Sequence, residues 1–156
     1  MIDLKKKLAW TLCLVWMAFI FIMSAMPGEV SGEQSGTLTK IVLSIFSFFF
    51  GESAAQSIPA NTLEFLIRKA AHMTEYAVLF LLLCRALRAS GAKHIALTAL
   101  VLSAVYAASD EFHQCFTDGR GPSPIDVCID TAGASIALLL RAVVLKLRKK
   151  PAKTHS

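Results

Sequence analysis

The sequence predicts an all-α membrane protein, built as one domain over residues 1–156 from a bundle of four transmembrane helices. Of the 156 residues, 55% are hydrophobic and only 17% are charged, whereas a typical soluble domain is about 25% charged. The apolar residues are gathered into long runs, and a run of about 20 residues can cross the ~30 Å core of a bilayer. Lys and Arg residues cluster in the stretches that flank these runs, which is typical of membrane topology.

The first predicted span covers residues 8–26, an uncharged run that follows the basic stretch Lys5-Lys6-Lys7. A cleaved signal peptide has the same basic start. However, its apolar region is usually about 7–15 residues long, and Pro27 lies where cleavage would have to occur. We therefore predict an uncleaved span.

Two loops and one short helix are predicted between the first and second spans. Residues 27–39 are polar and rich in Gly and Ser, a composition typical of a loop. Residues 40–50 form an apolar run that is too short to cross the membrane, so we predict a short helix that is either interfacial or re-entrant. Residues 51–61 are predicted to be a second loop, in which Pro59 breaks any continuing helix.

Three further apolar runs complete the predicted bundle. The second and third spans cover residues 70–88 and 94–112, joined by a tight turn at Ser90-Gly91-Ala92-Lys93. The third is short unless its helix continues through the polar stretch after it. The fourth covers residues 125–147, after a break rich in Gly and Pro. A basic tail, residues 148–156, is predicted to be disordered.

The basic residues predict that both termini are cytoplasmic. With four spans and a cytoplasmic amino terminus, 12 of the 16 Lys and Arg residues fall on the cytoplasmic side. Three separate stretches agree, which is a strong positive-inside signal. The net charge of +5 therefore records orientation, and we predict no nucleic-acid partner. The cytoplasmic residues are Lys5, Lys6, Lys7, Arg85, Arg88, Lys93, Arg141, Lys146, Arg148, Lys149, Lys150 and Lys153.

Acidic residues follow the opposite pattern, since only Asp3 falls on the cytoplasmic side. Acids contribute little to topology, so their position needs another reason. Avoidance of an anionic cytoplasmic leaflet accounts for Glu29, Glu33 and Glu52, which fall in predicted loops. It accounts poorly for acids inside the ends of predicted helices.

Polar stripes occur at the predicted outer ends of three spans. At about 100° per residue each stripe occupies one helix face, and charges left facing lipid would cost several kcal/mol. We therefore expect the stripes to point inward and to form either a polar pocket open to the outside or an ion-pair network that only joins the helices. The stripes are Arg68, Lys69, His72, Glu75 and Tyr76 in the second span, Asp110, Glu111, His113 and Gln114 in the third, and Asp126, Asp130 and Gly133 in the fourth.

The residue types in these stripes suit anion binding and proton transfer. Arg68, Lys69 and Arg120 could hold a phosphate or carboxylate, and a histidine paired with a carboxylate could act as a general base. His72, His113 and Glu111 are the catalytic candidates. The spacing is not HExxH, and the neighbouring Arg and Lys residues would repel a cation, so we predict no metal site and no cofactor. No phosphate-binding GxxxxGK[ST] loop is present.

The order of these residues resembles the VanZ-like family. The resemblance rests on Arg68-Lys69-x-x-His72-x-x-Glu75-Tyr76, on Asp110-Glu111-x-His113-Gln114-x-Phe116-x-x-x-Arg120-x-x-x-x-x-Asp126, and on Gly133. Ser24-x-x-Pro27 and Gln34-Ser35 are also similar to the family's pattern. The resemblance implies a small polytopic bacterial membrane protein, and the namesake is associated with teicoplanin resistance. By motif, the implied functional positions are Lys69, His72, Glu75, Tyr76, Asp110, Glu111, His113, Gln114, Arg120 and Asp126.

Three functions remain open from the sequence. The first is a multi-pass protein of the cell membrane that holds an envelope ligand, either a lipid-linked cell-wall precursor or a glycopeptide, in an extracytoplasmic pocket. The second is a membrane-embedded enzyme acting on a lipid or lipid-linked phosphate. The third is a structural membrane subunit. The lipid bilayer is the predicted partner in each case, and the oligomeric state is not specified.

Overall fold

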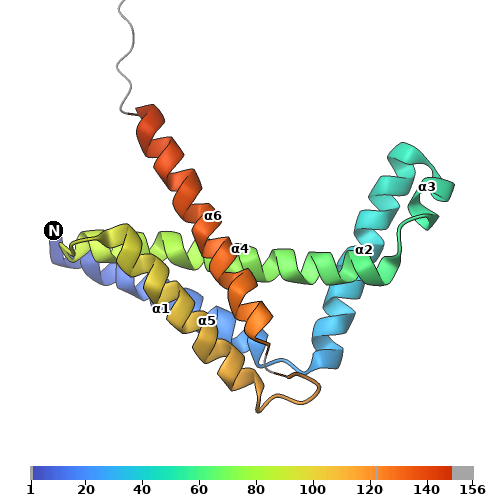
Figure 1. Cartoon of the computed structure of the whole chain (residues 1–156), viewed down its shortest axis with the longest axis horizontal. Helices are drawn as coiled ribbons and strands as arrows, with labels where there is room; N and C mark the ends of the chain where they lie inside the picture. Colours follow the sequence, from blue (N-terminus) through green and yellow to red (C-terminus); the bar gives the residue numbers. More distant parts are fainter. Residues whose placement is uncertain (1, 122, 149–156) are drawn as a thin grey trace, which may run out of the picture.

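The computed structural model describes residues 2–121 and 123–148, and within these residues it contains six α-helices and no strand (Figure 1). The segment after Arg148, predicted to be a disordered basic tail, lies outside the described residues. The helices are α1 (Ile2–Ser24), α2 (Gly28–Phe50), α3 (Glu52–Gln56), α4 (Ala60–Ala89), α5 (Ile95–Gln114) and α6 (Pro124–Arg148).

Four of these helices, α1, α4, α5 and α6, are long and apolar enough to cross a membrane. The predicted all-α class with four spans is therefore confirmed. Each helix contains most or all of its predicted span, and α4 begins ten residues before the predicted residue 70. The third span does continue into the polar stretch, because α5 ends only at Gln114. The cytoplasmic placement of both termini stays a prediction.

Helix α4 is the centre of the molecule. It packs against α1, α2, α5 and α6, and Figure 1 shows it running through the middle of the assembly. Its buried face includes Tyr76, Leu79, Phe80 and Leu83. These α4 residues form one core cluster with Cys13 and Ile20 of α1 and with alanines of α5 and α6. A single long helix thus positions every other membrane-spanning element.

Helices α4 and α6 approach each other closely. A Cβ atom added to Gly133 of α6 would collide with the backbone of Met73 in α4. Small residues at such crossings let helix backbones approach closely in a membrane. Gly133 of the fourth stripe therefore serves this close packing, and its contacting partner is Met73.

The segment predicted as a loop followed by a short helix is instead one 23-residue helix, α2. The prediction of a loop over residues 27–39 was wrong. It followed from the low helix propensity of Gly and Ser, but in the structure these small residues lie on the helix face that packs against α4. Ser35 and Thr39 are buried, and the space beside Gly32 and Gly36 is bounded by side chains of α4. These four small residues share one face at i, i+3, i+4 and i+7, so tertiary packing overrides the weak local propensity.

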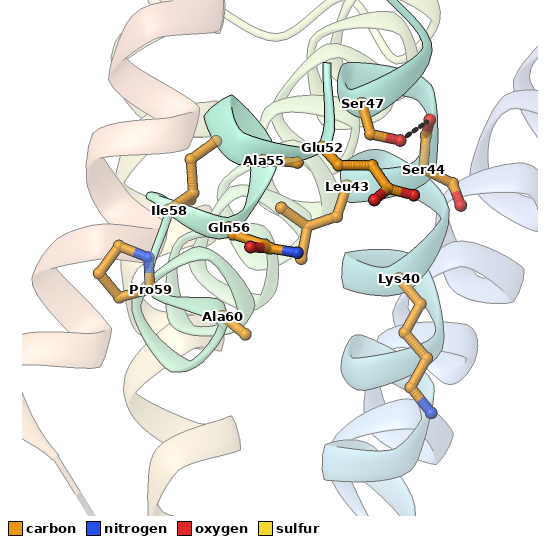
Figure 2. Close-up of a pocket in the computed structure, with 10 residues that line it drawn as sticks. All are labelled: Lys40, Leu43, Ser44, Ser47, Glu52, Ala55, Gln56, Ile58, Pro59 and Ala60. Atoms are coloured by element: carbon orange, nitrogen blue, oxygen red, sulfur yellow. Dashed lines mark hydrogen bonds between the residues drawn. The ribbon is translucent and has the colours of Figure 1, made fainter. Parts of the chain in front are cut away.

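Helix α2 crosses α4 near the amino-terminal end of α4, and the chain then turns back through α3 (Figure 1). The second predicted loop, residues 51–61, likewise contains a helix, the short α3, before Pro59 precedes α4. A cavity of about 680 Å³ lies between α2, α3 and the start of α4 (Figure 2). It is lined by residues such as Lys40 and Glu52 and by none of the residues of the three polar stripes.

We predict that Gly133→Ala destabilises the protein, because the added methyl group has no room against the α4 backbone. Overpacking of this kind typically costs about 1–3 kcal/mol. The measurement is the midpoint of thermal unfolding in detergent. Ala132→Val is the matched control, because Ala132 is adjacent to Gly133 but is exposed. An unchanged midpoint for Gly133→Ala would contradict the close crossing.

Candidate functional site

The three polar stripes meet at one end of the bundle, away from the amino-terminal lysines. Lys69 of α4 donates to Asp126 of α6 through a 2.6 Å contact between Nζ and Oδ1. Only 17% of the lysine side chain and 28% of the aspartate side chain are exposed. This partly buried ion pair joins the second and fourth predicted spans, as the stripes suggested.

Glu111 ties the third span to the fourth. The carboxylate of Glu111 is buried and accepts a hydrogen bond from the backbone N–H of Ser123 at 2.8 Å, just before α6 begins. A narrow space beside this contact is lined by Lys69, His72 and Asp126, together with Glu111, Ile129 and Asp130. Three helices therefore place their stripe residues around one point.

Helix α1 enters the site through Ser24. Gln114, at the end of α5, donates from Nε2 to Ser24 Oγ at 2.8 Å and to Asp110 Oδ2 at 3.3 Å. All three residues are buried. The oxygen of the same Gln114 amide accepts from Arg120 at 3.5 Å. A buried chain of hydrogen bonds thus leads from α1 to the guanidinium in the α5–α6 loop.

A cavity of about 140 Å³ lies on the other side of His72, between α4, α2, α1 and the α5–α6 loop. Arg68, His72, Glu75 and Arg120 all line it. Nδ1 of His72 lies 3.4 Å from Oε2 of Glu75. Two guanidinium groups, an imidazole and a carboxylate therefore share one small cavity, which we call the arginine cavity.

The two arginines of this cavity are held differently. Arg68 forms a 2.9 Å ion pair with Glu64 and donates to Ser35 Oγ at 3.1 Å. Ser35 in turn donates to the same Glu64 oxygen at 2.9 Å. The side chain of Arg120 has only the long hydrogen bond to Gln114 among the described residues. Its guanidinium is therefore less committed to a protein partner than that of Arg68.

Burial lowers the pKa of the Arg120 guanidinium, and the positive charge of Arg68 lowers it further. The carboxylates of Asp110, Glu111 and Glu75 act in the opposite direction. An arginine keeps its proton at neutral pH even when perturbed. Arg120 forms no ion pair among the described residues, so its partly buried charge in this cavity favours an anion.

The loop that carries Arg120 is attached to the start of α2. The N–H of Gly28 donates to the carbonyl of Asp118 at 3.1 Å. A Cβ atom at Gly28 would lie 2.6 Å from the carbonyl oxygen of Gly119, and Gly119 itself has a φ of +72°, which favours glycine. These two glycines bring α2 and the loop together above the arginine cavity.

Four predicted site residues line neither space: Asp110 and Gln114, which belong to the buried hydrogen-bond chain described above, and His113 and Tyr76. The ring of His113 packs against Phe21 of α1, with centroids 4.1 Å apart, and its buried Nδ1 has no hydrogen-bond partner among the described residues. Tyr76 is fully buried in the core next to Tyr106, and its hydroxyl likewise has no such partner there. Of the two candidate histidines, His72 lines the arginine cavity, whereas His113 does not.

The sequence analysis did not predict that α2 lines the arginine cavity. Gln34 and Ser35 line the arginine cavity, but the sequence singled them out only through the resemblance. Glu64, which holds Arg68, was assigned no role. The available signal was the spacing of Gly32, Ser35, Gly36 and Thr39, which fits a helix face.

Within the described residues, no group of three or more His, Cys, Asp or Glu side chains is arranged to hold a metal ion.

A family model described as VanZ/LLP1 matches residues 9–145, nearly the whole chain. The chain belongs to the VanZ-like family. The match includes every residue of the three stripes and the loop that carries Arg120. Searches of curated proteins and of solved structures found no match to this VanZ-like chain.

We predict that the Lys69–Asp126 pair stabilises the bundle. Lys69→Met and Asp126→Asn should each lower the free energy of unfolding by about 1–3 kcal/mol, because each leaves a partly buried charge without its partner. The double variant should lose less than the sum of the two. Unfolding in mixed detergent micelles measures these values.

The exposed pair Lys7–Asp3 provides the control for this cycle. It has a similar separation, 2.8 Å, but 71% and 74% of its side chains are exposed. Lys7→Met and Asp3→Asn should each change the free energy of unfolding by about 0.5 kcal/mol or less. Equal losses at the two pairs would show that the Lys69–Asp126 contact has no special structural role.

Proposed function

We propose that the protein is a multi-pass protein of the cell membrane whose arginine cavity binds an anionic envelope ligand on the extracytoplasmic side. One observation carries the proposal: Arg68 and Arg120 line the same cavity, and Arg120 makes only one long contact among the described residues. Guanidinium groups bind phosphate and carboxylate through paired hydrogen bonds. A lipid-linked cell-wall precursor or a glycopeptide-related molecule has this chemistry, and retention of either would contribute to glycopeptide resistance.

The extracytoplasmic placement is supported by the distribution of charge. The arginine cavity and the Lys69–Asp126 pair lie at the end of the bundle opposite Lys5, Lys6 and Lys7. Basic residues mark the cytoplasmic end of a membrane protein. A ligand that reaches the cavity would therefore come from the outer leaflet or the space beyond it.

A second candidate function is catalysis on a lipid or lipid-linked phosphate. It is favoured by the 3.4 Å approach of His72 to Glu75 at the wall of the arginine cavity. A histidine paired with a carboxylate can transfer a proton, while Arg120 would hold the phosphate. His113 and Glu111 are less suited to this role, because His113 packs on Phe21 and Glu111 is bonded to the Ser123 backbone.

A purely structural role, the third possibility, is supported by the satisfied contacts. The Lys69–Asp126 pair and the Glu111–Ser123 hydrogen bond join helices without leaving an open group. They explain part of the polar cluster as helix attachment. They do not explain why two arginines and His72 border a cavity.

We predict that the purified protein binds a short-chain polyprenyl diphosphate at least tenfold more tightly than the uncharged polyprenol. Arg120→Gln should remove this preference, because it removes the least committed positive charge. A tenfold loss corresponds to about 1.4 kcal/mol. Isothermal titration calorimetry in detergent provides the affinities.

Lys40→Gln is the matched control, since Lys40 is exposed and lines no part of the arginine cavity. Equal binding of the alcohol and the diphosphate, or an equal effect of both substitutions, would count against the anion site. Release of inorganic phosphate that stops in His72→Gln would favour the enzyme over the binding protein. Retention without release would favour binding.

We predict that a membrane-impermeant maleimide labels Cys115 and Cys128 in intact cells. Both thiols are exposed, and they lie in the loop and the first turns of α6 at the arginine-cavity end. The buried Cys13 and Cys84 should stay unlabelled in a Cys115→Ser, Cys128→Ser variant. Labelling of Cys115 only after the cells are opened would invert the topology.

A further inference from the structure

We propose that a groove between α4 and α6 binds an anionic phospholipid, with its phosphate on three arginines and one acyl chain along the groove. The site lies at the end of the bundle opposite the arginine cavity and does not depend on the function proposed for that cavity.

The head-group end is a basic pocket of about 180 Å³ between the two helices. Its lining consists of Leu81, Cys84, Arg85, Arg88 and Arg141. Among the described residues, none of these three arginines forms an ion pair with a carboxylate. Three like charges around one pocket repel each other unless an anion lies between them.

Among the described residues, no acid lines this pocket. The single acidic residue predicted on this side of the membrane is Asp3, and it is paired with Lys7. The neutralising group must therefore come from outside the described fold. Guanidinium groups bind phosphate in a bidentate manner, and basic pockets between spans on the cytoplasmic side suit acidic lipid head groups.

The basic pocket continues into an apolar groove of about 330 Å³. Leu81 lines both spaces, so they adjoin on α4. The groove follows one α4 face from Leu81 through Ala77 and Met73 to Ala70, and Gly133 and Ile136 of α6 form its other wall. From Ala70 to Leu81 the helix rises about 16 Å, which is the scale of half a ~30 Å bilayer core.

The two helices diverge beyond the point where they cross. Gly133 allows α6 to touch α4 near Met73, and Figure 1 shows α6 turning away from α4 beyond that crossing. Towards Arg141 the helices therefore separate and leave room for a chain and its head group. Arginines that only extended into water would explain the charges but not a groove of matching length beneath them.

The test is native mass spectrometry of the full chain with phosphatidylglycerol and with phosphatidylcholine of the same acyl chains. We expect one bound phosphatidylglycerol per chain and at least tenfold weaker retention of phosphatidylcholine. The triple variant Arg85→Gln, Arg88→Gln, Arg141→Gln should lose this preference. The triple variant with Lys at these positions keeps the charge needed for insertion, and it should weaken phosphatidylglycerol several-fold because the bidentate geometry is lost.

Two control variants separate this site from general charge attraction. Lys93→Gln, Lys146→Gln, Arg148→Gln removes the same charge near the same end, and these residues do not line the pocket; it should retain the preference. Thr74→Trp fills the groove and should weaken long-chain but not short-chain phosphatidylglycerol.

Equal retention of the two lipids, or an equal loss of preference in the control triple, would overturn the proposal. The proposal would also be overturned if the triple Lys variant kept the full preference for phosphatidylglycerol and Thr74→Trp left the retention of long-chain phosphatidylglycerol unchanged. A dimer that carries no lipid would identify a second chain as the occupant of the groove and would overturn it as well.

Discussion

The rest of the structure depends on the pairing of charges near the membrane edge, and the Lys69–Asp126 ion pair is the main example. A charged group at the edge of a hydrocarbon layer must find a partner inside the protein, and here the partners come from α4 and α6 at 2.6 Å. The same two helices meet at Gly133 and Met73, two turns further along α6. One polar contact and one steric contact therefore fix the register of α6 on the central helix.

That fixed crossing gives the molecule two different ends. On the side of the ion pair, α1, α2 and the α5–α6 loop close over the polar residues, so that Asp110, Gln114 and Ser24 are buried. On the other side, α6 departs from α4 and leaves a groove that ends in three arginines. Acidic groups are concentrated at the first end and nearly absent from the second. Protein elements enclose the first end, whereas the second end has an open groove between two helices.

Much of the fold could be predicted because long apolar runs have few solutions in a membrane. The four spans were predicted from length and charge alone, and the inward direction of the stripes followed from the cost of charges in lipid. Helix α2 could not be predicted in the same way. Ser35 in its first half donates to Glu64 of α4 and accepts from Arg68 of α4, and contacts between such distant residues are not visible in local composition. The separate places of His72 and His113 also required the structure, since both lie at helical spacing within their own stripes.

Helix α2 changes what the polar cluster can do. The sequence treated Arg68, Lys69 and Arg120 as three equivalent cations. In the structure Lys69 is neutralised by Asp126, and Arg68 is held by Glu64 and by Ser35 of α2. An anion that binds Arg68 must compete with Glu64, whereas one that binds Arg120 displaces only a 3.5 Å contact to Gln114. Because Gln114 also donates to Ser24 of α1, a ligand that engages Arg120 would act directly on one of the hydrogen bonds between α1 and α5. Under the proposed function, ligand binding would therefore be linked to the packing of the first span through the Gln114 amide.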